Sequence, residues 1–312
     1  MYKINFQKPI HIHFIGIGGI SMSGLAEILL EEGFTVSGSD AKESPLTKKL
    51  ESEGAVIHYG QCAENITDDI NCVVYTAAIN KSNPELMEAV GKKIPMLTRA
   101  ELLGQLMKNY DTPIAVSGTH GKTTTTSMIS EVLLAADMDP TISVGGILKT
   151  IGGNIRVGKS GNFITEACEY TNSFLHFYPK ISVILNIEED HLDFFKDLED
   201  IRHSFHQFSA LLPSDGTLII NGDIKDYQEI YEGLDCNVIT YGSSAEFDYS
   251  ATEIQYDEKG FVSFELLKHN TSCGRVQLSV TGDHNVSNAL AAIATAELLG
   301  IPMDTIRKGL LS

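Results

Sequence analysis

The stretch that decides the fold is S-G-T-H-G-K-T-T, residues 117–124. An apolar run at 114–117 precedes it and predicts a buried strand, and residues 122–136 have the pattern of a helix. Glycines let a backbone wrap around an anion, and the N–H groups and dipole of the following helix then face that anion. The stretch therefore predicts a phosphate-binding loop at a strand-to-helix turn of an α/β fold.

Two residues of this loop have expected chemical roles. Lys122 should neutralise phosphate charge, and the Thr123 hydroxyl can reach a Mg²⁺ ion. The usual pattern has its first glycine six residues before the lysine, where this chain has Val116, whereas Gly118 here stands four residues before Lys122. An incidental glycine-containing turn is the alternative, and the strand–loop–helix context disfavours it. The predicted phosphate-binding residues are Gly118, Thr119, His120, Gly121, Lys122, Thr123 and Thr124.

The residues before the loop alternate between strand and helix patterns. Strands are expected at 10–15, 34–38, 72–76 and 94–97, and helices at 21–32, 44–53, 84–90 and 98–107, the last of them capped by Thr98. This alternation is typical of a doubly wound parallel sheet. A polar break at Asn109–Pro113 predicts the boundary between a first domain, residues 1–110, and a second α/β domain, residues 111–312.

The second domain changes character along its length. Strands are expected at 162–165, 181–187 and 217–220, and helices at 198–211, 285–299 and 304–311. Between about 237 and 280 the chain has strand-like segments separated by Gly, Asp and Ser, which predicts hairpins at a sheet edge. We therefore expect an α/β domain with an antiparallel, strand-rich edge.

Composition excludes several classes of protein. The 312 residues carry a formal net charge of -18, which argues against a general nucleic-acid binder. Five cysteines without a C-x-x-C pair favour a reducing, cytoplasmic environment over a disulfide framework or a zinc site. No signal peptide is evident, and no run approaches the roughly 18 apolar residues of a membrane helix, so membrane insertion is not expected.

Two acidic segments follow predicted strands of the second domain. Glu166 ends one strand, and Glu188-Glu189-Asp190-His191 follows another. Because ligands gather at the carboxyl ends of parallel strands, these groups should converge on the phosphate-binding loop. Mg²⁺ prefers oxygen ligands, so residue chemistry favours Asp190 over His191. The alternative is a solvated acidic loop in which His191 is a cap or a core residue.

A second glycine loop, Gly16-Ile17-Gly18-Gly19, follows the first predicted strand and opens a helix. It is close to G-x-G-x-x-G, with Ser21 in place of the third glycine, and Asp40 ends the next strand where a dinucleotide fold places a ribose-binding carboxylate. The residues alone leave two interpretations open: an NAD-binding domain, or a tight turn with Asp40 as a cap.

The short phosphate loop resembles the G-T-x-G-K-T-T loop of the Mur ligase and folylpolyglutamate synthetase superfamily of ATP-dependent acid–amine ligases. The stretches 165–175 and 186–193 are similar to signatures of the Mur ligases that join L-alanine to UDP-N-acetylmuramic acid. This resemblance implies that Thr123 holds one Mg²⁺ and that Glu166 and His191 hold a second. A common family form reads E-A-D-E-S where this chain has E-A-C-E-Y at 166–170, which leaves the roles of the replaced Asp and Ser open.

The N-terminal loop is similar to the family stretches G-I-G-G-I-x-M-S-G-x-A and S-G-S-D, which implies that it binds the diphosphate of the UDP-sugar instead of NAD. The implied substrate-binding residues are Gly16, Gly18, Gly19, Ser21, Ser23, Asp40, Thr76, Ala77, Arg99 and Glu169. A further stretch, 282–289, resembles G-x-H-N-x-x-N-A, which implies that His284, Asn285 and Asn288 lie near the adenine of ATP. Its local interpretation is a helix start capped by Asp283 or Asn285.

The resemblance implies that ATP and Mg²⁺ activate the lactyl carboxylate of UDP-N-acetylmuramic acid as an acyl phosphate, which L-alanine then attacks. The expected catalytic residues are Lys122, Glu166, His191 and His120.

Three alternative functions remain open: a ligase that adds a preformed peptide to the same sugar nucleotide, an NAD-dependent dehydrogenase, and a nucleotide sensor. Family members carry a third domain with a D-D-Y-x-H-H-P-T-E-like element that does not occur here, so we expect this chain to bind ligands without forming the amide bond alone.

Overall fold

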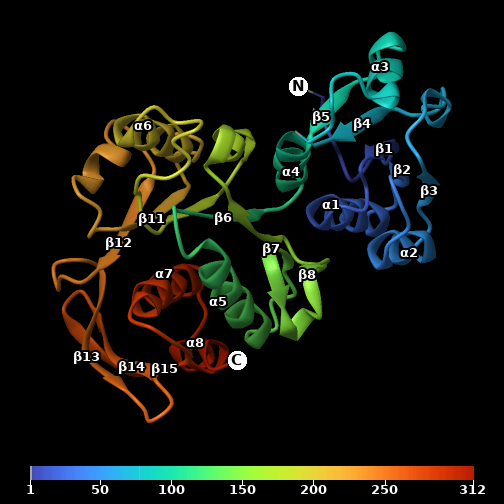
Figure 1. Cartoon of the computed structure of the whole chain (residues 1–312). Coiled ribbons are helices and arrows are strands. Elements are labelled where there is room, and N and C mark those ends of the chain that lie inside the picture. The colour runs from blue at the N-terminus through green and yellow to red at the C-terminus, as the bar shows by residue number, and fades with distance from the viewer. Residues whose placement is uncertain (1, 77) are drawn as a thin grey trace. The chain divides into compact units, whose positions relative to one another are not determined.

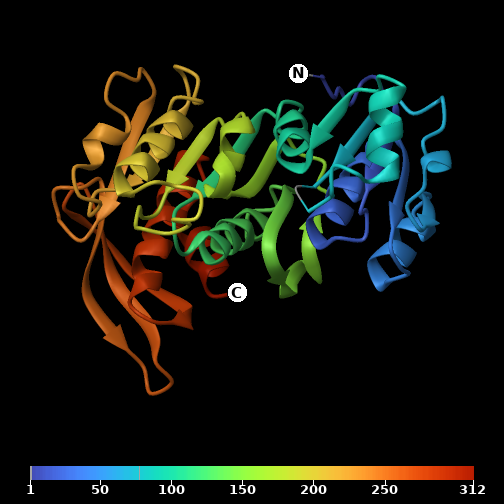
Figure 2. The same ribbon diagram turned by 45° about the horizontal axis from the view of Figure 1, so that its top comes forward.

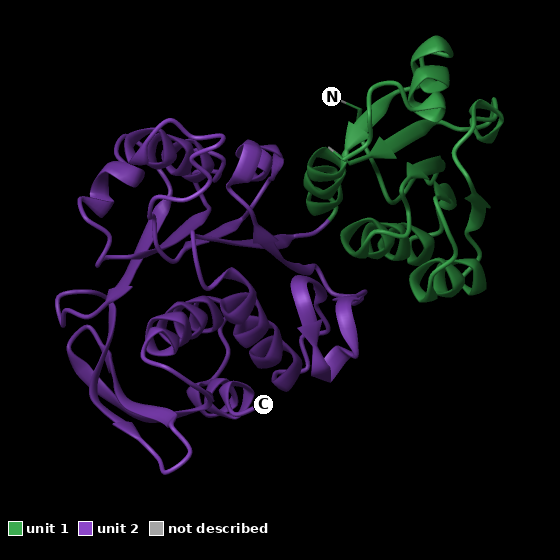
Figure 3. Ribbon diagram, in the orientation of Figure 1, with its two compact units in different colours: residues 1–109 green, residues 110–312 purple. Residues whose placement is uncertain are grey.

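A computed structural model describes residues 2–76 and 78–312. The chain forms two compact units, Met1–Asn109 and Tyr110–Ser312, shown in different colours in Figure 3. Each unit has its own sheet, of five strands in the first and ten in the second. The α/β fold class expected from the sequence is confirmed, because a parallel sheet forms the first unit and a mixed sheet the second.

The first unit is a parallel sheet with the strand order β3-β2-β1-β4-β5. Helices α1 and α2 lie on one side of it, and α3 and α4 on the other (Figure 1). This is the doubly wound arrangement that the alternating sequence pattern predicts. Its elements are β1 His11–Ile15, α1 Ile20–Glu31, β2 Thr35–Asp40, α2 Pro45–Ser52, β3 Val56–Tyr59, η1 Ala63–Asn65, β4 Cys72–Tyr75, α3 Pro84–Gly91, β5 Met96–Thr98 and α4 Arg99–Met107.

Side chains at the helix starts fix where these elements begin. Thr98 caps α4 as expected: Glu101 donates its backbone N–H to the Thr98 hydroxyl at 3.2 Å, and the Glu101 carboxylate accepts from the Thr98 N–H at 2.7 Å. Ser44 forms the same reciprocal arrangement with Thr47 at the start of α2. These pairs satisfy N–H groups that the first turn leaves without intrahelical partners.

A buried carboxylate joins α3 to the sheet. Glu85 accepts hydrogen bonds from Ser39 Oγ and Asn65 Nδ2, each at 2.5 Å. The ring of His13 on β1 lies beside it, with Nε2 3.8 Å from Glu85 Oε2, and both side chains are fully buried. Burial alone raises the pKa of Glu85, but the hydrogen bonds from His13, Ser39 and Asn65 outweigh it and hold this pKa below its usual value.

We expect Glu85 to make the stability of the first unit depend on acid pH. A depressed folded-state pKa contributes stability above the unfolded value of about 4.3, and this contribution is lost as the pH falls through the folded pKa. Glu85→Gln should cost about 1.5–3 kcal/mol at neutral pH, the usual value of hydrogen bonds to a charged group. The melting temperature of Glu85→Gln should also fall less steeply than that of the parent between about pH 5 and pH 3.

The control for this experiment is Glu88→Gln, on the same helix but with a side chain that is 38% exposed. It should retain the parental pH dependence, because exposed ion pairs contribute little. Parallel pH profiles for the parent and Glu85→Gln would contradict the assignment.

The second unit is built on a sheet with the order β15-β14-β13-β12-β11-β10-β6-β9-β7-β8. Its interior strands are parallel, and antiparallel pairs lie at both edges. The strands are β6 Thr112–Ser117, β7 Thr141–Leu148, β8 Gly153–Arg156, β9 Asn162–Ala167, β10 Ile181–Ile184, β11 Thr217–Asn221, β12 Asn237–Gly242, β13 Tyr249–Tyr256, β14 Phe261–Lys268 and β15 Thr271–Thr281.

The hairpins expected between 237 and 280 are found only in part. Strands β13, β14 and β15 are antiparallel neighbours and form the ribbon, orange in Figure 2, that extends from the end of the sheet. The prediction is wrong for β12, which pairs parallel with β11. The segment between β11 and β12 crosses over through η4, Tyr227–Ile230, and alternation of residues does not distinguish such a crossover from a hairpin.

Helices cover both faces of this sheet. Helices α5, α7 and α8 pack together on one side, and α6 lies on the other (Figure 1). The alanine-rich α7 is buried along most of its length, so it passes through the centre of the larger hydrophobic core. In the described residues no helix has both the length and the apolar composition needed to cross a membrane. The remaining elements are α5 Lys122–Ala135, η2 Lys149–Ile151, η3 Tyr170–His176, α6 Leu198–Ser209, α7 His284–Leu298 and α8 Met303–Leu310.

Candidate functional site

Three adjacent strands of the second unit end at the same edge of the sheet. In the register of the ladder, Ser117 at the end of β6 is opposite Ala167 of β9 on one side and Ile184 of β10 on the other. The loops that follow these strands therefore start side by side. This is the convergence that the sequence predicts for the phosphate loop and the two acidic segments.

Hydrogen bonds with Asn186, in the segment after β10, hold the phosphate loop in place. The backbone oxygen of Asn186 accepts from the Thr119 N–H at 3.2 Å, and its side-chain amide exchanges hydrogen bonds with the N–H and C=O of His120. Gly118 and Gly121 have φ values of 146° and 84°, which favour glycine. Sequence reasoning missed the role of Asn186 because the expected strand at 181–187 included it, whereas β10 ends at Ile184.

The start of α5 is open to an anion. Its N-cap residue is Gly121, and among the described residues no side chain caps the helix. The N–H groups of the first turn, which includes Lys122, Thr123 and Thr124, precede the intrahelical ladder that begins with Thr125 donating to Gly121. Together with the helix dipole, these groups form a site suited to phosphate.

Lys122 is folded back over the loop and paired with Glu169. Its Nζ donates to the Gly118 carbonyl at 2.5 Å and lies 3.0 Å from Glu169 Oε2. Glu169 is only 2% exposed and the Lys122 side chain is 16% exposed, so the carboxylate is buried and the ammonium group is partly buried. We expected Glu169 among the substrate-binding residues, and the structure places it beside the phosphate loop. A phosphate at the start of α5 would compete with Glu169 for the ammonium group.

Glu169 also belongs to a group of possible metal ligands. Within the part of the chain that the structure describes, Glu169, Asp190 and His191 are the one group of this kind, with ligand atoms all within 4.8 Å of one another. The Asp190 carboxylate also accepts from the His191 backbone N–H at 2.7 Å. Two carboxylates and an imidazole are a donor set that a divalent cation can use, although Mg²⁺ prefers the oxygens. The residues present therefore fit a divalent cation.

Glu166 and Thr123 meet a different segment, the glycine pair of β7. Glu166 Oε1 accepts from the Gly145 N–H at 2.5 Å. A Cβ built on Gly146 would lie 3.3 Å from the Thr123 methyl carbon, so the same glycine pair also contacts Thr123. The structure thus brings Thr123 and Glu166 to β7, and Glu166 is not a member of the group around His191.

The predicted adenine residues lie at the start of α7. A Cβ built on Gly121 would lie 2.7 Å from Asn288 Oδ1, so Asn288 packs directly against the phosphate loop. Asn285 links it to the end of β15, because Asn285 Oδ1 accepts from Asn288 Nδ2 and Asn285 Nδ2 donates to the Thr281 carbonyl. Neither Asp283 nor Asn285 caps the helix with its side chain, and His284 is exposed in the first turn.

His120 lies at the exposed tip of the phosphate loop. Its Nε2 is 3.8 Å from Glu188 Oε2, and both side chains are more than 60% exposed. The backbone N–H of Glu188 donates to the Thr119 hydroxyl at 2.9 Å, which ties the His191 loop to the phosphate loop. Glu188 was not among the expected site residues, and its contact depends on two loops far apart in the sequence.

The glycine loop of the first unit is closed by Asp40. The Gly18 N–H donates to Asp40 Oδ2 at 2.8 Å, and the Ala41 N–H donates to Asp40 Oδ1 at 2.7 Å. Gly16 and Ile17 both donate their N–H groups to the Ser39 carbonyl. Among the described residues no side chain caps the following helix α1, so its first turn is open to an anion.

The other substrate-binding candidates differ in their placement. Ser21 is exposed in the first turn of α1, whereas Ser23 is buried and donates to the Ile20 carbonyl. Thr76 and Arg99 directly follow β4 and β5, whose last residues are in register with the end of β1, so both begin at the same sheet edge as the glycine loop. Gly19 is the N-cap of α1. Ala77 lies outside the described residues.

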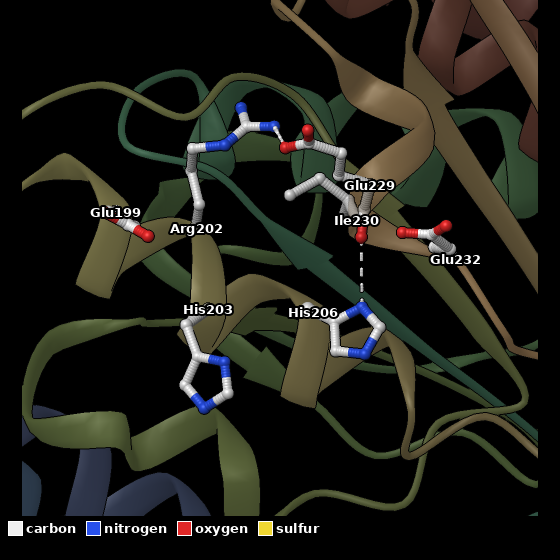
Figure 4. A pocket seen from close by; sticks show the side chains of 7 residues that line it. All are labelled: Glu199, Arg202, His203, His206, Glu229, Ile230 and Glu232. Atoms are coloured by element: carbon white, nitrogen blue, oxygen red, sulfur yellow. Dashed lines mark hydrogen bonds and ion pairs between the residues drawn. The ribbon is translucent and has the colours of Figure 1, made fainter.

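A separate surface pocket lies between α6 and η4 (Figure 4). Arg202 donates to Glu229 Oε2 at 2.9 Å, and His206 Nδ1 lies 3.1 Å from the Glu229 carbonyl. These groups pair with each other and fasten the helix to the segment after β11, so we assign them a structural role.

Comparison with known proteins supplies the family. Residues 116–296 match the family description "Mur ligase middle domain", and residues 11–111 match "Mur ligase family, catalytic domain". The chain belongs to the Mur ligase family. The resemblance stated from the sequence is confirmed, and the protein is an ATP-dependent ligase of this family.

Several Mur ligases are similar over nearly the whole chain. The UDP-N-acetylmuramate–L-alanine ligase of Agathobacter rectalis is 63% identical over 99% of this chain and 68% of its own length, and that of Lachnospira eligens is 60% identical over the same shares. A UDP-N-acetylmuramate:L-alanyl-gamma-D-glutamyl-meso-diaminopimelate ligase structure from Neisseria meningitides has a TM-score of 0.86 at 31% identity, covering 97% of this chain and 98% of that one. The UDP-N-acetylmuramate-alanine ligase structure from Thermotoga maritima has a TM-score of 0.81 at 29% identity, over 96% and 68%.

Proposed function

We propose that this Mur ligase joins L-alanine to the lactyl carboxylate of UDP-N-acetylmuramic acid, with ATP as the energy source. The observation that carries this proposal is the 63% identity, over 99% of the chain, to a curated ligase named for that reaction. The matched region includes both glycine loops and both acidic segments, which are the parts of the chain that the chemistry would use. The reaction would contribute to peptidoglycan precursor synthesis.

The reaction has two steps in which the protein mainly positions and neutralises anions. A carboxylate oxygen of the sugar nucleotide attacks the γ-phosphorus of ATP, the bond to the β-phosphate oxygen breaks, and ADP leaves. The alanine nitrogen then attacks the acyl carbon, loses a proton, and inorganic phosphate leaves. Lys122 and the first-turn N–H groups of α5 are suited to holding the transferred phosphoryl group, and His120 at the loop tip is suited to a contact with either substrate.

A metal site accompanies the phosphate loop in this proposal. Thr123, Glu166 and His191 are the proposed ligands of Mg²⁺, and the structure adds Glu169 and Asp190 as groups within reach of His191. When bound, Mg²⁺ would neutralise phosphate oxygens as charge develops on them. His284, Asn285 and Asn288 are proposed to contact the nucleotide, since Asn288 packs against Gly121 at the loop.

The first unit is proposed to hold the UDP-sugar. Its diphosphate would bind at the open first turn of α1, near Gly16, Gly18, Gly19 and Ser21. Asp40 holds this loop closed, because each of its carboxylate oxygens accepts a backbone N–H. Thr76 and Arg99 would extend the path of the substrate along the same sheet edge.

The ligase that adds a preformed peptide is the nearest alternative. The structure from Neisseria meningitides is named for that reaction and has a similar fold, but it is 31% identical to this chain, about half the identity to the alanine ligase of Agathobacter rectalis. We therefore propose L-alanine as the amine.

A cytoplasmic location is proposed because the five cysteines are free thiols, as expected in a reducing compartment.

The proposal is tested by ligand and amine specificity. Calorimetry on the chain should show micromolar binding of UDP-N-acetylmuramic acid and no heat with NADH. In a ligation assay that includes the family's third domain, ADP formation should depend on L-alanine and should not respond to the L-alanyl-γ-D-glutamyl-meso-diaminopimelate peptide. Binding of NADH without binding of the UDP-sugar would refute the ligase proposal, and a response to the peptide alone would assign the alternative ligase.

A further inference from the structure

Tyr170 connects the two acidic segments of the site. It directly follows Glu169 at the start of η3, and its hydroxyl donates to Asp193 Oδ2 at 2.8 Å. Its ring lies against that of His191, with centroids 4.5 Å apart at an interplanar angle of 35°, and makes an edge contact with Phe194 at 6.1 Å. One side chain therefore contacts three residues of the loop that follows β10.

The loop it contacts is held in an unfavourable conformation. His191 has a φ of 51°, in the left-handed region that residues with a Cβ rarely adopt. Its carbonyl accepts from the N–H groups of Phe194 and Phe195 at 2.8 and 2.9 Å, which closes a tight turn. Those bonds fix the backbone of His191, but they leave the two side-chain torsions of the imidazole free.

The ring of Tyr170 restricts the imidazole torsions that the backbone hydrogen bonds leave free. The imidazole is one-third exposed, so packing on its other sides is incomplete. The tilted ring contact restricts the plane of the imidazole, together with Asp190 Oδ1 at 3.8 Å from His191 Nδ1, and the hydrogen bond to Asp193 fixes the phenol in turn. In this orientation a ring nitrogen of His191 is within 4.8 Å of the oxygens of Glu169 and Asp190.

We propose that Tyr170 is a positioning residue that orients His191 for metal binding. This inference depends on the proposed function, because it assumes that His191 is a metal ligand. It also gives a role to a position where this chain departs from the common family form, which has serine. A serine lacks the ring that packs on the imidazole, so its orienting contact must differ.

The experiment measures His191 in the metal-free protein and the affinity for Mn²⁺ alone. In Tyr170→Leu, the NMR signals of the His191 ring carbons and protons should move toward those of the exposed His203, because the ring current of Tyr170 is lost. In Tyr170→Phe they should stay near the parental positions. The dissociation constant for Mn²⁺ should rise about 10-fold in Tyr170→Leu, as for other partners that orient a metal ligand, and less than twofold in Tyr170→Phe.

Further variants distinguish failure of this inference from failure of the proposed metal site. Tyr227→Leu removes a tyrosine from another aromatic cluster of the same unit and should leave Mn²⁺ affinity unchanged. Unchanged Mn²⁺ affinity in His191→Ala would remove the proposed metal site, and the inference with it. Weaker binding in His191→Ala, together with parental affinity and parental His191 signals in Tyr170→Leu, would overturn the inference alone. If Tyr170→Leu fails to fold, Tyr170→Ser, the common family form, is judged by the same two measurements.

Discussion

Replacing Lys122 with methionine should weaken Mg-ATP binding about 10- to 150-fold, and it should reduce turnover about 100- to 1,000-fold when the family's third domain is present. The first range follows from about 1.5–3 kcal/mol for hydrogen bonds to a charged group, and the second from the usual effect of removing one group that stabilises transition-state charge. Lys122 lies directly over the phosphate loop, where its Nζ donates to the Gly118 carbonyl. Calorimetry and steady-state kinetics measure the two effects.

The same substitution should also destabilise the second unit. It leaves the buried carboxylate of Glu169 without its cation, and breaking a buried pair in this way costs about 3–5 kcal/mol. The double variant Lys122→Met/Glu169→Gln removes both charges and should recover most of the melting temperature without recovering ATP binding. Lys180→Met, at a surface pair with Asp215, is the control and should change neither property. A stable double variant that binds ATP within about twofold of the parent would refute the role of Lys122.

Gly121→Ala should abolish detectable ATP binding at concentrations that saturate the parent. The alanine Cβ would lie 2.7 Å from Asn288 Oδ1, and the φ of 84° is unfavourable for alanine. Backbone strain of this kind costs on the order of 1–3 kcal/mol. Relieving the contact requires a shift of the loop or of the Asn288 side chain, which is buried and donates to Asn285 Oδ1. The first-turn N–H groups of α5 would then no longer point at one phosphate position.

A second glycine with a positive φ serves as a control, because its substitution introduces backbone strain without a new side-chain contact. Gly152 has a φ of 67° in the same unit, and a Cβ built there meets nothing within 4 Å. Gly152→Ala should therefore lower the melting temperature slightly and leave ATP affinity at the parental value. If both variants weaken ATP binding equally, general strain, and not the contact with Asn288, explains the loss.

The sequence predicted most of the architecture because the signals for it are local. Alternating strand and helix patterns predict the parallel sheet, Thr98 predicts a cap, and the glycine loops mark strand-to-helix turns. Strand β3 was missed because Val56–Tyr59 is short and lies at the sheet edge. The hairpin of β7 and β8 was missed because Gly145 and Gly146 interrupt the pattern of β7, as glycines do in loops.

The site was less predictable because its contacts join distant residues. Glu169 and Lys122 are 47 positions apart, and their pairing requires the register of β6 with β9. The resemblance groups Glu166 with His191, whereas the structure assembles Glu169, Asp190 and His191. Short-range patterns indicate which residues have suitable chemistry, but only the order and register of strands determine which of them meet.

The strand order has a consequence for how the protein resists local opening. The three strands that carry the site, β10, β6 and β9, are interior neighbours with parallel partners on both sides, and the irregular hairpins are confined to the two edges of the sheet. Amide hydrogens at those edges can exchange with solvent through fraying of one or two strands, whereas exchange in β6 requires a larger cooperative opening. We therefore expect the strand ends that hold the phosphate loop and Glu169 to exchange most slowly. Glu166 and Thr123, which contact β7 of one edge hairpin, should instead follow the fluctuations of that edge.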